Sequence, residues 1–149
     1  MLLNIVNDEE LVTSQIVKGI LLIILISGII YNLYRFFREG SPKIKKINFA
    51  LFVLLMVFSM FVFKTYRIES GLLKSPEYVT GITSGYCSVF ALGAGIEFEY
   101  QVNGQQIRRC NTYHPISKDS IVAIGGKYKV RFSKEFPEEG RMNFKMRIE

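Results

Sequence analysis

The chain has 149 residues, of which 49% are hydrophobic and 21% are charged, and its formal net charge is +6. The apolar residues are concentrated, because no charged residue occurs from Gly19 to Tyr34 or from Ile47 to Phe63. Runs of this kind approach the length that crosses a bilayer, which excludes an ordinary cytosolic globule. One histidine and two cysteines exclude most metal sites, and we expect neither a metal nor a cofactor.

The two apolar runs predict a hairpin of transmembrane helices near Ile16–Phe37 and Ile47–Tyr66. At about 1.5 Å of rise per residue, each run is long enough to reach across the hydrocarbon layer. Gly40, Ser41 and Pro42 break the helix between them. We therefore expect an N-terminal tail over 1–15, the hairpin over 16–67, a juxtamembrane connector over 68–77 and a small β domain over 78–149.

The positive charge is concentrated in the link between the apolar runs, which holds Arg35, Arg38, Lys43, Lys45 and Lys46 against Glu39. Such a loop favours the cytoplasmic side of a bacterial inner membrane, so we expect both termini in the periplasm. Lys18 and Arg35, at the ends of the first run, are expected to extend their charges toward the headgroups. This distribution does not indicate a nucleic-acid-binding surface.

After Pro76 the apolar residues recur with the period of a strand. Ile96–Val102 alternates apolar with polar side chains, and Asn103-Gly104 follows as a hairpin signal that places Glu99 opposite Arg108. We expect a small all-β domain of about five or six strands, either an antiparallel meander or a small β-barrel. The other expected strands are Tyr78–Thr83, with Tyr86–Ala91 continuing it or standing alone, Gln105–Cys110, Ile121–Ile124, Lys127–Phe132 and Met142–Ile148, with a turn at Gly125-Gly126.

Two segments of the C-terminal half carry a family resemblance. Ile96–Gly104 ends in Tyr100-Gln101-Val102-Asn103-Gly104, and Gly125–Glu135 reads GGKYKVRFSKE. The order resembles small bacterial membrane proteins, common in Bacteroidetes-type genomes, in which YxVNG precedes GxxYxVxYSxxNP. Phe136-Pro137 stands where that family usually has Asn-Pro. The resemblance implies membrane spans with a β domain of unknown function, and it brings no catalytic residues.

The candidate site residues fall into three groups. In a periplasmic domain Cys87 and Cys110 could form a disulfide, whereas in the cytosol both would stay free. The loop from Asn111 to Ser120 offers Tyr113, His114, Lys118 and Asp119 for binding a partner, and a solvated loop histidine is expected rather than a catalytic base. Strand residues form a candidate basic patch of Arg108, Arg109, Lys127, Lys129 and Arg131, which could also be an ordinary charged strand face.

Two functions remain open, and neither is enzymatic. The first is an inner-membrane-anchored binding protein whose β domain meets a protein partner, such as an immunity protein that neutralises a toxin acting in the envelope. The alternative is a membrane-disrupting antiphage defence effector whose cytosolic β domain senses a nucleotide messenger, which needs the opposite topology. Association of copies through the transmembrane helices is compatible with both functions.

Overall fold

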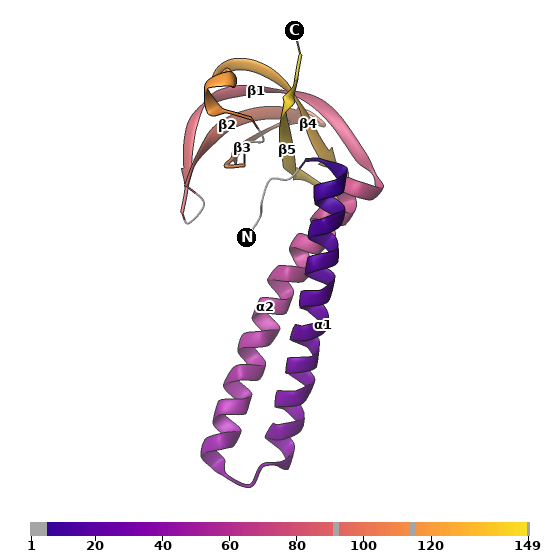
Figure 1. Cartoon of the computed structure of the whole chain (residues 1–149), viewed down its shortest axis with the longest axis vertical. Coiled ribbons are helices and arrows are strands. Elements are labelled where there is room, and N and C mark those ends of the chain that lie inside the picture. The colour runs from indigo at the N-terminus through magenta and orange to yellow at the C-terminus, as the bar shows by residue number, and fades with distance from the viewer. Residues whose placement is uncertain (1–5, 91–92, 114–115, 149) are drawn as a thin grey trace. The chain divides into compact units, whose positions relative to one another are not determined.

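The computed structural model describes residues 6–90, 93–113 and 116–148, apart from the side chain of Lys118. Figure 1 shows two long helices followed by a curved sheet. The elements are α1 (Asp8–Arg38), α2 (Pro42–Lys74), β1 (Pro76–Val89), β2 (Gly93–Val102), β3 (Gln105–Asn111), the short 3₁₀ helix η1 (Lys118–Ser120), β4 (Ile124–Ser133) and β5 (Phe136–Arg147).

The chain divides into two compact units, which are described separately. The hairpin unit is Val12–Glu69, and the sheet unit joins the residues up to Leu11 to Ser70–Glu149. The first turn of α1 and the last turn of α2 therefore belong to the sheet unit.

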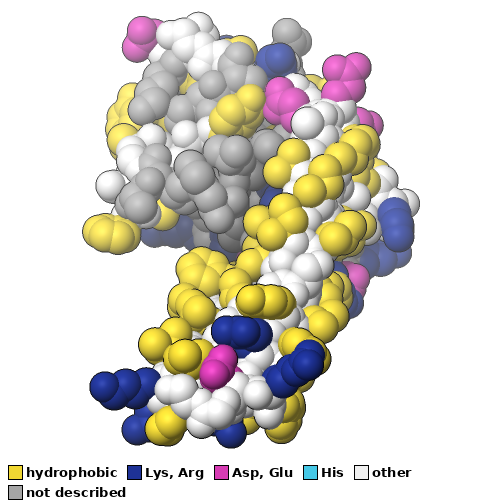
Figure 2. Space-filling view, turned by 60° about the horizontal axis from the view of Figure 1, so that its bottom comes forward, with side chains coloured by type: hydrophobic (Ala, Val, Ile, Leu, Met, Phe, Trp, Pro, Cys, Tyr) yellow, Lys and Arg dark blue, Asp and Glu magenta, His cyan; other side chains and the backbone are white. Residues whose placement is uncertain are grey.

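Both helices of the hairpin unit are long and apolar enough to cross a membrane. Figure 2 shows hydrophobic side chains along the hairpin and basic side chains gathered around its turn. Gly28 lets the helices approach, because a Cβ there would lie 3.1 Å from the Leu55 side chain. The hairpin of apolar helices that the sequence predicts is therefore confirmed.

The helices extend beyond the predicted spans. α1 begins at Asp8, inside the expected tail, and α2 continues to Lys74, through most of the expected connector. Asp8, Glu9 and Glu10 in the first turn of α1 suit the positive end of the helix dipole. No proline interrupts α2 after Pro42 until Pro76, so the helix can continue to the start of β1.

The expected small all-β domain is confirmed as one antiparallel sheet, with strand order β3-β2-β1-β4-β5 and the long β1 at its centre. Of the two expected forms, the sheet is the open one and not the closed barrel, but its order differs from a simple meander because β4 pairs with β1 rather than with β3. Its edge strands meet through side chains rather than a backbone ladder: Arg109 of β3 pairs with Glu139, and Asn111 Nδ2 donates to Met142 O at 3.1 Å. The sheet therefore curls but remains open.

The predicted hairpin between β2 and β3 is confirmed in its register. Tyr100 pairs with Ile107, and Glu99 pairs with Arg108. Asn103 and Gly104 have φ values of 52° and 81°, the left-handed conformations that a tight two-residue turn requires.

Of the two alternatives for Tyr86–Ala91, the structure shows that this segment continues Tyr78–Thr83, because β1 runs from Pro76 to Val89 with a register shift between Thr83 and Gly85; Ala91 lies outside the described residues. One strand prediction needs correction. Most of Ile121–Ile124 lies outside the sheet, since β4 begins only at Ile124 and includes the predicted turn at Gly125 and Gly126. Side chains hold that segment instead: Thr83 Oγ1 donates to Val122 O at 2.7 Å, and Tyr128 Oη accepts from Val122 N at 3.0 Å.

The core lies on the inner face of the curled sheet. It is built from alternate residues of the strands and from one residue of the loop before β4. Tyr128 and Phe144 meet edge to face with ring centroids 5.4 Å apart. The buried members are Ile96, Phe98, Tyr100, Ile107, Ile121, Tyr128, Val130, Met142 and Phe144.

Candidate binding surface

The outer face of β1 carries a row of exposed apolar side chains, which we call the β1 ridge: Tyr78, Ile82, Tyr86 and the adjoining Phe90. From Tyr78 onward the even-numbered residues of β1 are exposed, and the odd-numbered ones between them are buried or half-buried. The exposed fraction is 74% for Tyr86 and 99% for Phe90. A row of large apolar side chains on one exposed face marks an interaction surface, whereas single exposed ones do not.

Polar and basic side chains border the ridge on both sides. On β4, Lys129 pairs in register with Thr80 and Lys127 with Ile82, and both lysines are exposed. Lys129 Nζ lies 5.1 Å from the centroid of the Tyr78 ring. On β2, Glu99 pairs with Ile82, and its carboxylate is held by Arg108 of β3. An apolar centre with a charged rim is the usual composition of a protein-binding surface.

The rim on the β2 side carries a net negative charge, because one guanidinium, that of Arg108, faces the two carboxylates of Glu97 and Glu99. The hydrogen bond from Arg108 Nε to Glu99 Oε1, at 2.7 Å, holds the pKa of the Glu99 carboxyl below its ordinary value. Ser84 Oγ donates to Glu97 Oε2 at 3.0 Å, and Arg108 lies 3.8 Å from the same oxygen. The net positive charge beside the ridge therefore comes from the two β4 lysines.

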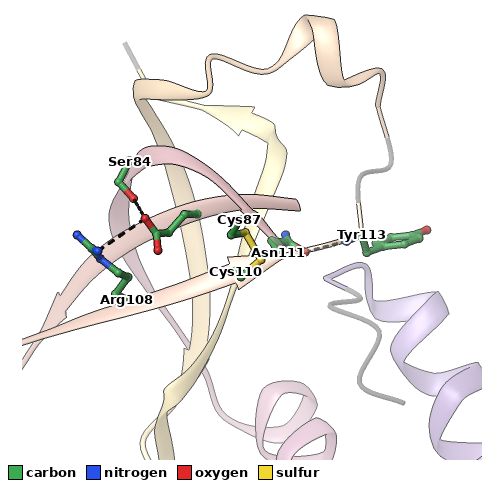
Figure 3. The surroundings of a disulfide bond; sticks show 7 residues. Ser84, Cys87, Arg108, Cys110, Asn111 and Tyr113 are labelled. Carbon is green, nitrogen blue, oxygen red and sulfur yellow. Dashed lines mark hydrogen bonds and ion pairs between the residues drawn. A yellow bond between two sulfur atoms is a disulfide. The ribbon is translucent and has the colours of Figure 1, made fainter. Parts of the chain in front are cut away.

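A disulfide fixes the end of the ridge that carries Tyr86 and Phe90. Cys87 of β1 is bonded to Cys110 of β3, with their Cα atoms 6.0 Å apart (Figure 3). The bond crosses β2, where Gly95 pairs with Cys87. Gly95 has no side chain to separate the strands, and a Cβ there would lie 2.5 Å from Asn111 O. The bond therefore restrains β1 next to Tyr86.

The predicted partner-binding loop is described only in part. Asp119 lies exposed in η1, whereas His114 and the Lys118 side chain fall outside the described residues. Tyr113 N donates to Asn111 Oδ1 at 3.2 Å, which Figure 3 shows beside the disulfide. The Tyr113 hydroxyl donates to Glu10, 3.3 Å from Oε2, and partial burial together with that carboxylate raises the pKa of Tyr113. Tyr113 therefore already has a partner within the chain.

The five residues of the candidate basic patch are not brought together. Arg108 and Arg109 lie on β3, which β2 and β1 separate from β4. Arg108 pairs with Glu99, Arg109 pairs with Glu139, and Arg131 is buried. Lys127 and Lys129 are exposed beside the β1 ridge, and Arg108 is exposed but ion-paired on β3.

The β1 ridge was not predicted from the sequence, although the alternation of large apolar residues that forms it is present there. Tyr78, Ile82, Tyr86 and Phe90 recur at even positions, but Val79 and Cys87 occupy the odd positions between them. With apolar side chains on both faces, periodicity does not reveal which face meets the core.

Comparison of the chain with family models, with curated proteins and with solved structures finds no match.

Proposed function

We propose that this protein is a non-enzymatic binding protein of the bacterial inner membrane, whose β domain recognises a protein partner outside the cytoplasm. The observation that carries the proposal is the β1 ridge, an exposed row of aromatic and aliphatic side chains on a rigid strand. Tyrosine and phenylalanine contribute large contact areas with few rotatable bonds, which suits them as interface anchors.

The disulfide supports the extracytoplasmic location. Bonds of this kind persist in oxidising compartments and are rare in the bacterial cytosol. The basic turn between α1 and α2 supports the same topology, since Lys and Arg favour the cytoplasmic side. An immunity protein that neutralises an envelope-acting toxin has these properties: a membrane anchor, a small stapled domain and a surface for one partner.

Topology is tested by placing a cysteine at Ser41, in the turn of the hairpin. In intact cells, a membrane-impermeant maleimide should leave Ser41→Cys unlabelled until the membrane is permeabilised. Labelling from outside would refute the proposed orientation. It would instead favour the alternative, a defence effector with a cytosolic nucleotide-sensing β domain.

Partner binding is tested by photo-crosslinking in cells. A photoreactive amino acid at Tyr86 should yield a discrete adduct with a second protein, and the same amino acid at Gln105, exposed on the opposite face of β3, should not. Phe90→Ser should weaken the Tyr86 adduct by removing a neighbouring anchor. Adducts of equal strength at both positions, or none at Tyr86, would contradict the ridge as the binding surface.

The loop from Asn111 to Ser120 remains part of the proposed surface. Tyr113→Ala combined with Lys118→Glu should weaken the same adduct, and His114→Ala alone should leave it unchanged. If His114→Ala instead abolished the protein's biological effect while folding and crosslinking persisted, the domain would be catalytic rather than a binding module.

A further inference from the structure

Arg131, in β4, contacts both helix ends that belong to the sheet unit. Its Nε donates to Leu72 O, in the last turn of α2, at 2.9 Å. One terminal nitrogen donates to Val6 O at 3.0 Å and pairs with the Asp8 carboxylate, where α1 begins. The side chain is buried, so these partners replace water around the guanidinium. One side chain of the sheet thus holds the ends of both helices.

The surrounding packing shows that the last turn of α2 is closely docked on β4. A Cβ added at Gly71 would lie 2.8 Å from Ser133 Oγ and 3.1 Å from Ser133 Cβ, so a side chain at this position would have to displace Ser133 or the helix. Leu11 and Leu72, one from each helix end, are fully buried. Between the end of α2 at Lys74 and the start of β1 at Pro76 there is only Ser75. The helix ends are therefore integral to the sheet unit.

Arg131 is also the neighbour of the β1 ridge. In the register of β1 and β4 it pairs with Tyr78, the first residue of the ridge. Side chains of paired residues in antiparallel strands project to the same face. Lys129, which contacts the Tyr78 ring, lies two residues before Arg131 on β4. A partner bound at Tyr78 would therefore lie beside Arg131, the residue that contacts both helix ends.

We propose that Arg131 couples occupancy of the Tyr78 end of the β1 ridge to the two helix ends that belong to the sheet unit, the first turn of α1 and the last turn of α2. α1 and α2 each run without a break from the sheet unit into the hairpin unit. The identity of the natural occupant rests on the function proposed above, but the coupling itself does not.

The test uses the full chain in lipid nanodiscs and a bulky maleimide as the occupant. Tyr78→Cys is labelled, and hydrogen exchange is followed over residues 6–11 and 70–75. The bulky label should displace the Arg131 side chain and break its hydrogen bonds to Leu72 O and Val6 O. Hydrogen exchange at both helix ends should therefore accelerate by about tenfold. The matched control is labelled Ser88→Cys, which is exposed on the same face of β1 at its other end. It should leave both helix ends unchanged.

A second variant separates coupling from general damage. In an Arg131→Lys background, which keeps the charge but loses the branched donor group, the label at Tyr78 should no longer alter exchange at the helix ends. Unchanged exchange over 98–107 and an intact Cys87–Cys110 bond verify that the sheet is folded. Equal effects from Tyr78 and Ser88, no effect from Tyr78, a response in one helix alone, or an undiminished response in the Arg131→Lys background would each overturn the proposal. Loss of the partner adduct at Tyr86 would leave this result untouched.

Discussion

Lys18 of α1 and Glu69 of α2 form an ion pair across the hairpin, with Lys18 Nζ 2.6 Å from Glu69 Oε2. Ser14 Oγ donates to the same carboxylate oxygen at 3.0 Å. The Glu69 side chain is fully buried, and the Lys18 side chain is 15% exposed. Lys18 was expected to extend toward the headgroups, but it turns to Glu69 because a buried carboxylate needs a counter-charge.

Glu69→Gln should destabilise the hairpin, because it leaves the Lys18 ammonium buried without its counter-charge. Breaking one half of a buried pair costs about 3–5 kcal/mol. The measurement is unfolding of the full chain in mixed detergent micelles. The control is Glu39→Gln, which removes the more exposed pair with Arg35 and should cost under about 0.5 kcal/mol. Equal losses in the free energy of unfolding would show that the Lys18–Glu69 pair stabilises the hairpin no more than the exposed Arg35–Glu39 pair does.

Gly104→Val should destabilise the β domain by more than about 1 kcal/mol, because valine is strained at the positive φ of this turn. Apart from Gly104 itself and its two chain neighbours, none of the described residues has a heavy atom within 4 Å of a Cβ at Gly104, so the cost reports backbone strain rather than a clash. Thermal unfolding of the full chain measures it. Gln105→Val, at an exposed strand position, serves as the control and should not lower the melting temperature. A Gly104→Val melting temperature equal to that of the wild type would contradict the turn.

Cys87→Ser combined with Cys110→Ser should lower the free energy of unfolding by about 3 kcal/mol. The bond closes a loop with a sequence separation of 23, and loop-closure entropy predicts a cost of this size. Hydrogen exchange should rise most next to Tyr86, where β1 loses its link to β3. Treating the wild type with a reductant should reproduce the effect. If the double variant had the same free energy of unfolding as the oxidised wild type, the Cys87–Cys110 disulfide would not stabilise the domain.

Tyr100→Phe should cost about 1–3 kcal/mol, because it leaves backbone groups without their partner. The Tyr100 hydroxyl donates to Pro137 O at 2.6 Å and accepts from Gly140 N at 2.9 Å. Chemical denaturation of the full chain measures the loss. Tyr86→Phe is the control, since the Tyr86 side chain is largely exposed, and it should change stability little. If both variants were equally stable, the Tyr100 hydroxyl would have no part in joining β2 to β5.

Stability should also fall in alkali through the same residue. Burial raises the pKa of Tyr100 in the folded protein, so the unfolded chain loses this proton first as the pH rises. The contribution is fully present below the unfolded pKa of about 10 and is lost as the pH rises through the folded value. Denaturation curves at increasing pH should therefore show a steeper alkaline loss for the wild type than for Tyr100→Phe. Equal slopes would exclude Tyr100 as the cause.

Local features of the sequence determined the parts of this protein that depend on local physics. The uncharged runs determined the helical hairpin, because hydrophobic length alone decides whether a helix suits a bilayer. Asn103-Gly104 determined the β2–β3 register, because few residue pairs adopt that turn. Neither inference required knowledge of distant residues.

Tertiary structure decided which strand faces are buried and which charges are free. Lys127, Lys129 and Arg131 alternate identically in the sequence, yet Arg131 alone is buried, because the ends of α1 and α2 supply it with acceptors from far along the chain. The openness of the sheet and the exposure of the β1 ridge were decided in the same way. Each depends on which distant segment covers a face, and periodicity along one strand carries no information about that contact.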